Sequence, residues 1–334
     1  MTAEAIAPDI VTAATDDSAR TGTAKRIALR LITGFGVLWG ATTLSFLGVR
    51  LAPGDTVDVL LGEQPRTPEV EAAIRAEWGL DSPAVVQYAR YLWNVVQGDF
   101  GRSYVLQRPV SEVIGSQAGP TLALTGAALL VALVFAVVVA TTTAQRRRSR
   151  AIANAVELAL VSTPAFWLGI VLLSVFSFQL KIFPVAANKG LSALVLPALA
   201  LGLSLGAVIS QVLRDGLERA LDEPFAVTVR SWSVSESALR LRHGLRHAAL
   251  PAVTLTGWLV GGLLGGAVII EEVFGRPGLG RVTVEAVLAQ DLPVVLAVAI
   301  LSAFVYVVIS TSVDLLYLWL DPRLRRDSGT EGQR

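Results

Sequence analysis

The 334-residue sequence contains no cysteine, only two histidines and a single methionine. The absence of cysteine excludes a disulfide, a thiolate nucleophile and a cysteine-bound metal. No G-x-x-x-x-G-K-[ST] motif occurs, because none of the lysines (Lys25, Lys181 and Lys189) follows a glycine, and the chain therefore has no phosphate-cradling loop. Neither a nucleophile elbow nor an HExxH helix is present. We therefore expect no enzymatic activity, no bound cofactor and no metal site in this chain.

Charged residues are scarce as well. They make up 16% of the sequence, whereas typical soluble domains have about a quarter, and 53% of the residues are hydrophobic. This composition predicts an integral membrane protein that lies in a lipid bilayer. The net charge of +1 gives no strong attraction to nucleic acid, so no nucleic-acid partner is expected.

Six apolar runs are each long enough to cross a bilayer as a helix, and they cover approximately residues 31–49, 122–144, 151–180, 191–213, 253–270 and 292–320. The longer runs must tilt or extend past the interface. The first run follows the basic residues Lys25, Arg26 and Arg30 and lacks a small-residue cleavage site, so we expect a retained helix rather than a signal peptide.

Basic residues sort the loops by the positive-inside rule. Clusters within 25–30, 146–150, 214–246 and 323–326 place these segments inside, and the alternate loops 51–116, 181–190 and 271–291 fall outside. The pattern predicts an all-α membrane protein with six transmembrane helices and both termini in the cytoplasm. We expect a disordered cytoplasmic tail (1–24), a first helix (25–50), a small helical extracytoplasmic subdomain (51–116), a five-helix domain (117–320) and a second cytoplasmic tail (321–334).

The outer segment 51–116 has turn signals at Pro53-Gly54-Asp55 and helical patterns over 68–78 and 83–96. We expect these turns and helices to pack together as a small lid rather than to contact a substrate directly.

A polar stretch between two spans, 214–251, is too long for a plain connector and too polar for hydrocarbon. Residues 214–221 favour a helix, Pro224 breaks it, and a short helical piece is expected over 225–233. Ser235 is placed to cap a third helix, and Pro251 to open the next span at its first turn. The stretch is therefore expected to be a structured cytoplasmic element that docks onto a partner.

Both histidines lie in this loop, at His243 and His247. Their i, i+4 spacing would allow one metal ion on a helix face, but no third ligand is evident and arginines adjoin both. We expect no metal here.

Two acidic residues fall inside predicted spans, Glu157 and Asp314. Charges in hydrocarbon are costly, and we favour interfacial contacts or an interhelical ion pair over a proton relay. Small residues crowd two other spans: Gly202 and Gly206 form a G-x-x-x-G step, and five glycines lie within 257–266. Close helix packing explains them, and a glycine-lined translocation path between two subunits is compatible with the same pattern.

The polar stretch resembles the cytoplasmic EAA loop of permeases in ABC importers, specifically the B-type permease of dipeptide, oligopeptide and nickel systems. The matching segments are PFAVTVRSWS at 224–233 and HGLRHAALP at 243–251. Ser233 replaces the usual glycine, Trp232 the usual Lys or Arg, and Val229 the usual alanine. Glycine permits a turn with positive φ, and we expect serine to turn otherwise. The resemblance implies an ATPase-coupling role for Glu218, Glu223, Pro224, Phe225, Thr228, Arg230, Ser231, Trp232, Ser233 and Arg246.

Two outer segments are similar to the same family. One is the series GLDSP, QY, YL and GDFGRS between residues 79 and 103, and the other is EEVFGRPGLGR at 271–281. For the second segment the resemblance implies a place at the outer mouth of a translocation path, carried by Glu271, Phe274, Pro277, Gly278 and Gly280. A re-entrant turn capped by carboxylates is the alternative. Asp314 falls in a V-D-L-L-Y match at 313–317, ahead of the D-P-R-L-R ending at 321–325, which favours a role in architecture.

The resemblance implies a multi-pass permease subunit in a prokaryotic inner membrane. Its expected partners are a second homologous permease, two ATP-binding subunits that hold ATP and Mg, and an extracytoplasmic solute-binding protein. Peptides are the expected substrate, with nickel or a metal chelate as the alternative. A self-contained secondary carrier would predict internal repeats, which are not visible, and an intramembrane enzyme lacks a catalytic constellation.

Overall fold

The computed structural model describes residues 32–320, with gaps at 49, 52–55, 62–64 and 186–189, and for 56, 58 and 313–320 it describes the backbone alone. The described part is helical throughout and has no strand, only an isolated bridge between Arg102 and Pro109. The predicted all-α class is thereby confirmed. The expected Pro53-Gly54-Asp55 turn, both tails and the basic residues in them lie outside the described residues.

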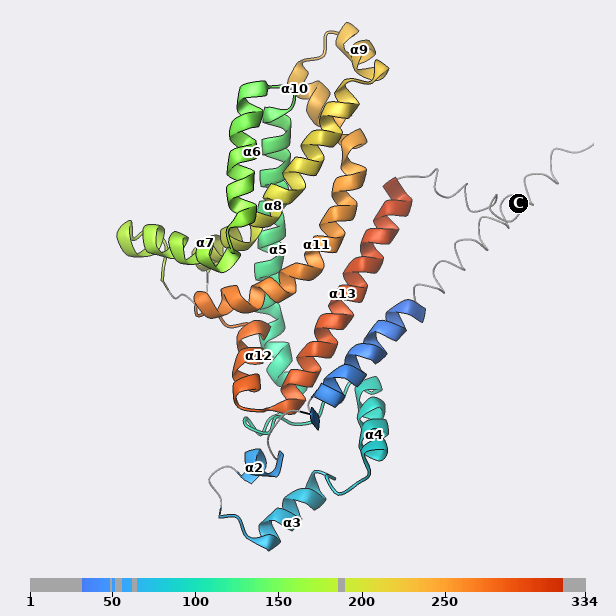
Figure 1. The fold of residues 1–334 in the computed structure, drawn as a ribbon, viewed down its shortest axis with the longest axis vertical. Helices are drawn as coiled ribbons and strands as arrows, with labels where there is room; N and C mark the ends of the chain where they lie inside the picture. Colours follow the sequence, from blue (N-terminus) through green and yellow to red (C-terminus); the bar gives the residue numbers. More distant parts are fainter. Residues whose placement is uncertain (1–31, 49, 52–55, 62–64, 186–189, 321–334) are drawn as a thin grey trace, which may run out of the picture.

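Three long helices form the centre of the molecule: α5 (Val110–Thr143), α8 (Ser192–Leu221) and α11 (Leu245–Val273) (Figure 1). The α5–α8 contact follows from small residues. The alanines at 128, 132, 136 and 140 repeat every fourth position of α5 and are fully buried. A Cβ built on Gly202 would lie 2.5 Å from the Ala128 carbonyl oxygen, and one on Gly206 would lie 2.8 Å from that of Ala132. The predicted close packing at this G-x-x-x-G step is confirmed.

Within the described residues, four helices are long and apolar enough to cross a membrane: Val110–Thr143, Ser192–Leu221, Glu236–Val273 and Leu292–Ser312, the last within α13 (Leu292–Leu320). A shorter apolar helix spans Ile32–Gly48. The expected run at 151–180 is not one straight helix. It bends by 103° between Arg147–Ser162 and Ala165–Gln179. If the bent pair is one span, the described part has up to 5 of these spans, and the full count of six stays a prediction.

The bend separates α6 (Arg147–Ser162) from α7 (Ala165–Leu172), which continues as the π-helix η1 (Leu173–Gln179). Thr163 is extended at ψ 124° and Pro164 at ψ 136°. Proline disfavours the helical region for the residue before it and supplies no N–H to continue the ladder. The chain therefore turns at this point, and α7 runs across the bundle (Figure 1).

The polar stretch folds as predicted at its start. Helix α8 extends to Leu221, and α9 (Pro224–Ser231) begins with Pro224 in its first turn. Ser235 caps α10 (Glu236–Ala238), and its hydroxyl accepts a hydrogen bond from Ala238 N at 3.3 Å. The π-helix η2 (Leu239–Gly244) then leads into α11.

The expectation that Pro251 opens a span is wrong, because it lies inside α11. The helix loses one backbone hydrogen bond there. Packing on both sides holds it together: Ala248 and Ala252 are buried, and Ala248 lies so close to α8 that a Cβ built on Gly216 would be 3.2 Å from its Cβ.

Helices α2 (Thr56–Leu61), α3 (Pro68–Glu77) and α4 (Ala84–Val96) form a small subdomain, which we call the outer subdomain after its predicted side of the membrane, and α3 and α4 confirm the two predicted helices. Figure 1 shows α9 and α10 at one end of the molecule and α2, α3 and α12 (Leu279–Leu288) at the other. Asp291, between α12 and α13, joins the subdomain to the bundle: it accepts hydrogen bonds from the Ser103 hydroxyl and from Tyr104 N at 3.0 Å.

Candidate functional site

Helix α9 stands at the tip of the molecule, and one face holds it in place. Ala226 and Val229 are buried on this face. The Phe225 ring stacks on the His247 ring with their centroids 4.5 Å apart and an interplanar angle of 22°. These contacts fix α9 against the base of α11.

The other face of α9 has no covering element within the described chain. Val227 and Trp232 are each 68% exposed, and Glu223, Thr228 and Ser231 are exposed beside them. Exposed apolar side chains of this size on a polar tip make this face a candidate interaction surface. Most of the residues predicted for ATPase coupling lie together here, and their role stays a prediction.

Ser233 adopts the left-handed conformation, with φ 56°, and its N–H donates to the Arg230 carbonyl at 3.1 Å. The expectation that serine turns differently from glycine is therefore wrong. The closing hydrogen bond holds the serine in a region that disfavours L-residues by roughly 1–2 kcal/mol. The turn after α9 keeps the path that a glycine permits.

An ion pair braces this turn. Arg230 Nε lies 2.8 Å from Glu236 Oε1, joining α9 to α10. The hydrogen bond from Arg230 lowers the pKa of Glu236, and the same bond raises the pKa of Arg230. Arg246 is exposed at the start of α11.

Glu218 is not part of the tip. It lies in α8 and pairs with Arg150 at the start of α6, and it also accepts from Gln145 N at 3.2 Å. Asp215 lies 3.4 Å from Arg150 on the same side. This partly exposed ion pair between Arg150 and Glu218 ties α6 to α8.

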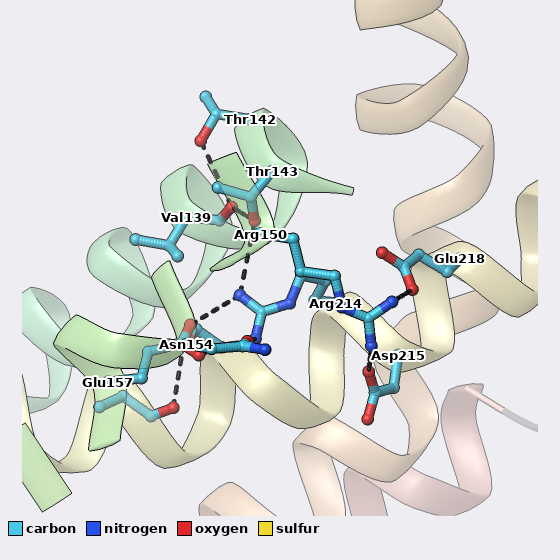
Figure 2. Close-up of polar contacts among 11 residues, drawn as sticks. Val139, Thr142, Thr143, Arg150, Asn154, Glu157, Arg214, Asp215 and Glu218 are labelled. Carbon is cyan, nitrogen blue, oxygen red and sulfur yellow. Dashed lines mark hydrogen bonds and ion pairs between the residues drawn. The ribbon is translucent and has the colours of Figure 1, made fainter. Parts of the chain in front are cut away.

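A buried ion pair lies one turn deeper (Figure 2). Arg214 Nη1 lies 2.8 Å from Glu157 Oε1, and Arg214 Nη2 lies 2.7 Å from Glu157 Oε2. The Ser210 hydroxyl also donates to Glu157, and Asn154 Oδ1 accepts from Arg214 at 2.7 Å. The predicted interhelical pair is confirmed for Glu157. For Asp314 the structure places only the backbone, in α13.

Sequence reasoning missed Arg214 as the partner because it treated the first arginine after an apolar run as the end of the span. A signal was present: an acid inside one span and a base at the edge of another on the same side of the membrane.

The 271–281 turn is built around the Glu271 carboxylate, which is fully buried. It accepts hydrogen bonds from the Thr121 hydroxyl at 2.6 Å, from Gly280 N at 2.8 Å and from Arg281 N at 3.4 Å. A Cβ built on Gly278 would lie 2.2 Å from this carboxylate. The Pro-Gly-Leu-Gly pattern is therefore the consequence of a backbone wrapped closely around one acid.

The rest of the turn is anchored to neighbouring helices. Phe274 is buried, and a Cβ built on Gly169 of α7 would be 3.0 Å from its ring. Arg276 Nη1 donates to the Ala193 carbonyl of α8 at 2.9 Å. Pro277 and Gly278 line a small cleft beside α12. The turn links α11 to α12 and contacts α5, α7 and α8, and its place at the mouth of a path stays a prediction.

No group of three or more metal-ligating side chains occurs among the residues that the structure describes. His243 and His247 belong to no such group, and the His247 ring packs on Phe225.

The all-helical architecture, with apolar helices long enough to cross a membrane and a structured polar tip, is that of an integral membrane protein. Residues 103–326 match the family described as "Binding-protein-dependent transport system inner membrane component", and the chain belongs to this family. It is an ABC-importer permease of the inner membrane, a transport component that is not itself catalytic. Membership in this family rules out the alternative of a self-contained secondary carrier. It implies ATP-binding and solute-binding partners.

Curated relatives cover almost the whole chain. The glutathione transport system permease protein GsiC of Salmonella paratyphi A is 37% identical over 298 residues, which are 89% of this chain and 97% of the relative. A putative peptide transport system permease protein of Brucella abortus is 35% identical over 311 residues, and the match covers 90% of this chain and 99% of the relative. A crystal structure of an amino acid ABC transporter aligns with 62% of this chain and 92% of its own, at 18% identity and a TM-score of 0.44.

Proposed function

We propose that this chain and a second, homologous permease form the translocation path of an ATP-driven peptide importer. In this assembly six helices of the chain cross the bilayer with both termini in the cytoplasm. A solute-binding protein delivers the peptide from outside, and two ATP-binding subunits hydrolyse MgATP inside. The observation that carries the proposal is the exposed face of α9, centred on Val227 and Trp232.

A short helix with one anchored and one open face suits the transfer of movement. The anchored face is tied to α11 through Phe225 and His247. The preceding helix α8 is tied to α6 through two ion pairs, Arg214 with Glu157 and Arg150 with Glu218. Closure of an ATPase on the open face would thus move several spans as a rigid unit.

The pairing with a second permease is supported by a stripe on α11. Its exposed residues Pro251, Thr254, Trp258, Gly262, Gly265 and Ile269 follow heptad-like spacing along one face. A Cβ built on Gly262 or Gly265 would meet no atom within 4 Å. Small residues on such a face allow a second helix to approach closely.

Peptide as substrate is supported by the names of the relatives, which are glutathione and peptide permeases. The chain has no cysteine and one methionine, and such a chain is poor in the soft ligands that would favour a naked nickel path.

The test is purification of the chain from its native membrane in a gentle detergent, with the partners identified by mass spectrometry. We expect a second permease and ATP-binding subunits in stoichiometric amounts. The ligand of the co-purified binding protein then identifies the substrate, and nickel or a chelate bound to it would replace peptide in the proposal. Recovery of this chain alone, still moving a solute without ATP, would overturn it.

A further inference from the structure

A cavity of about 470 Å³ opens between the outer subdomain and the start of α13. Helix α4 and the start of α13, which line it, lie at the end of the molecule opposite α9 (Figure 1). Its walls come from the first helix (Phe46), from Trp78 after α3, from α4, from the 99–104 loop and from α13 (Leu292 and Leu296). Its volume is that of a pocket for a small ligand, in the range of about 300–1,000 Å³.

The charge of this pocket is strongly one-sided. Its described lining contains four arginines and one acid, Asp99, whose carboxylate is engaged with Gly101 N at 2.9 Å. Arg75 is paired with Glu71. The other three (Arg50, Arg90 and Arg102) have no carboxylate partner among the described residues.

The contacts found for these three arginines are to uncharged groups and do not neutralise them. Arg50 donates to the neutral side chain of Gln87 at 3.1 Å, and Arg102 donates to the Gln107 carbonyl at 3.2 Å. Arg90 lies over the turn at Gly79, which adopts the left-handed conformation. A Cβ built on Gly79 would be 2.8 Å from Arg90 Nη1. The rim of the pocket therefore attracts anions.

A second observation points to a ligand. Tyr91 lines this pocket, and its buried hydroxyl has no hydrogen-bond partner among the described residues. Buried polar atoms without partners are rare in folded proteins. Burial raises the pKa of Tyr91, so its hydroxyl stays protonated and can donate a hydrogen bond to an anion.

The floor of the pocket is aromatic. The Trp78 and Tyr104 rings meet edge to face at 4.9 Å, and the Phe46 and Tyr91 rings stack at 6.0 Å. An aromatic floor beneath a cationic rim suits a ligand with an apolar side chain next to a carboxylate. An acidic loop of a partner protein would use the rim but not the floor.

From this geometry we infer that the pocket binds the carboxyl end of a short peptide on the outer face of the permease, before the peptide enters the translocation path. The inference rests on the proposed function in peptide import. Arg90 and Arg102 hold the carboxylate, Tyr91 donates a hydrogen bond to it, and the ring of a C-terminal aromatic residue packs on Trp78. Leu292 and Leu296 place the bound peptide against the start of α13.

The test is calorimetric titration of alanyl-phenylalanine, and of its C-terminal amide, into the complex of permeases and ATP-binding subunits without the binding protein. We expect the free acid to bind at least about tenfold more tightly than the amide, because the amide lacks the charge that the arginines recognise. This comparison uses the wild-type complex and does not depend on the folding of a variant.

The variants Arg90→Gln and Tyr91→Phe should each weaken binding of the free acid by about fivefold or more. Arg147→Gln, at an exposed arginine at the other end of the molecule, is the matched control and should leave it unchanged. Equal affinity for acid and amide, insensitivity to Arg90→Gln, or binding only after the binding protein is added would overturn the inference. ATP-driven uptake of the same dipeptide by the wild-type complex separates the two proposals: uptake without this binding refutes the pocket alone, and absence of uptake refutes the importer function.

Discussion

Arg214 in α8 and Glu157 in α6 form a two-bond ion pair that is closed to solvent, with the side chains 2% and 0% exposed. The pair lies two turns before Leu221, where α8 ends and the chain turns into α9. It therefore joins the helix that leads to the proposed ATPase contact to the helix that precedes the 103° bend.

Removing one partner of this pair should be costly, because an unpaired charge would stay buried. Glu157→Ala is expected to lower the free energy of unfolding by about 3–5 kcal/mol. Thermal unfolding of the purified chain in detergent measures this. The double variant Glu157→Leu with Arg214→Met should recover most of the loss, because it removes both charges.

The control is Glu112→Ala, which breaks the exposed pair with Arg108 and should cost less than about 1 kcal/mol. If Glu157→Ala and Glu112→Ala shifted the unfolding midpoint equally, the buried pair would not hold α6 to α8.

The turn after α9 depends on the left-handed conformation of Ser233. Ser233→Gly should keep both the fold and the transport activity, since glycine adopts this conformation freely. Ser233→Val should destabilise the turn by roughly 1–2 kcal/mol or more, because a β-branched side chain is strained there. ATPase subunits retained on the purified permease provide the readout. Equal retention by the two variants would show that the path of this turn does not matter for docking.

The exposed Trp232 side chain should contribute to the ATPase contact. Trp232→Asp is expected to weaken retention of the ATP-binding subunits at least tenfold, because large aromatic residues at interfaces contribute 2 kcal/mol or more, by a rough estimate. Trp93→Asp provides a matched control, since Trp93 is 66% exposed on α4 at the opposite end of the molecule. Normal retention and normal uptake by Trp232→Asp would mean that α9 is not the docking site.

The Glu271 carboxylate leaves no space for a side chain at Gly278. Gly278→Ala should displace the carboxylate from its three donors and destabilise the chain by roughly 1–3 kcal/mol. Gly115→Ala, in α5 with no atom within 4 Å of the built Cβ, should be neutral or slightly stabilising. Thermal unfolding distinguishes them, and a stable Gly278→Ala would show that the turn can open without loss.

Much of the polar tip could be predicted from local chemistry. Pro224 and Ser235 act through their own backbones and nearest neighbours, so the boundaries of α9 and α10 follow from sequence. The ABC-permease family could also be identified from the motifs alone.

What could not be predicted depends on contacts distant in the sequence. Pro120, Pro197 and Pro251 lie inside helices, whereas Pro164 marks a break. Sequence alone does not distinguish these four prolines. Whether the helix continues through a proline depends on whether neighbouring helices hold the segments before and after it in line. The burial of Arg214 also depends on a distant contact, because it requires Glu157 from another helix.

The most direct test of the account is uptake of a radiolabelled dipeptide by proteoliposomes that contain this permease with its co-purified partners and the solute-binding protein. We predict accumulation that requires internal MgATP and is lost when Trp232→Asp replaces the wild-type chain, while Trp93→Asp transports normally. Uptake that is independent of ATP, or equally strong with Trp232→Asp, would contradict the claim that this chain carries ATPase movement into a peptide path through α9.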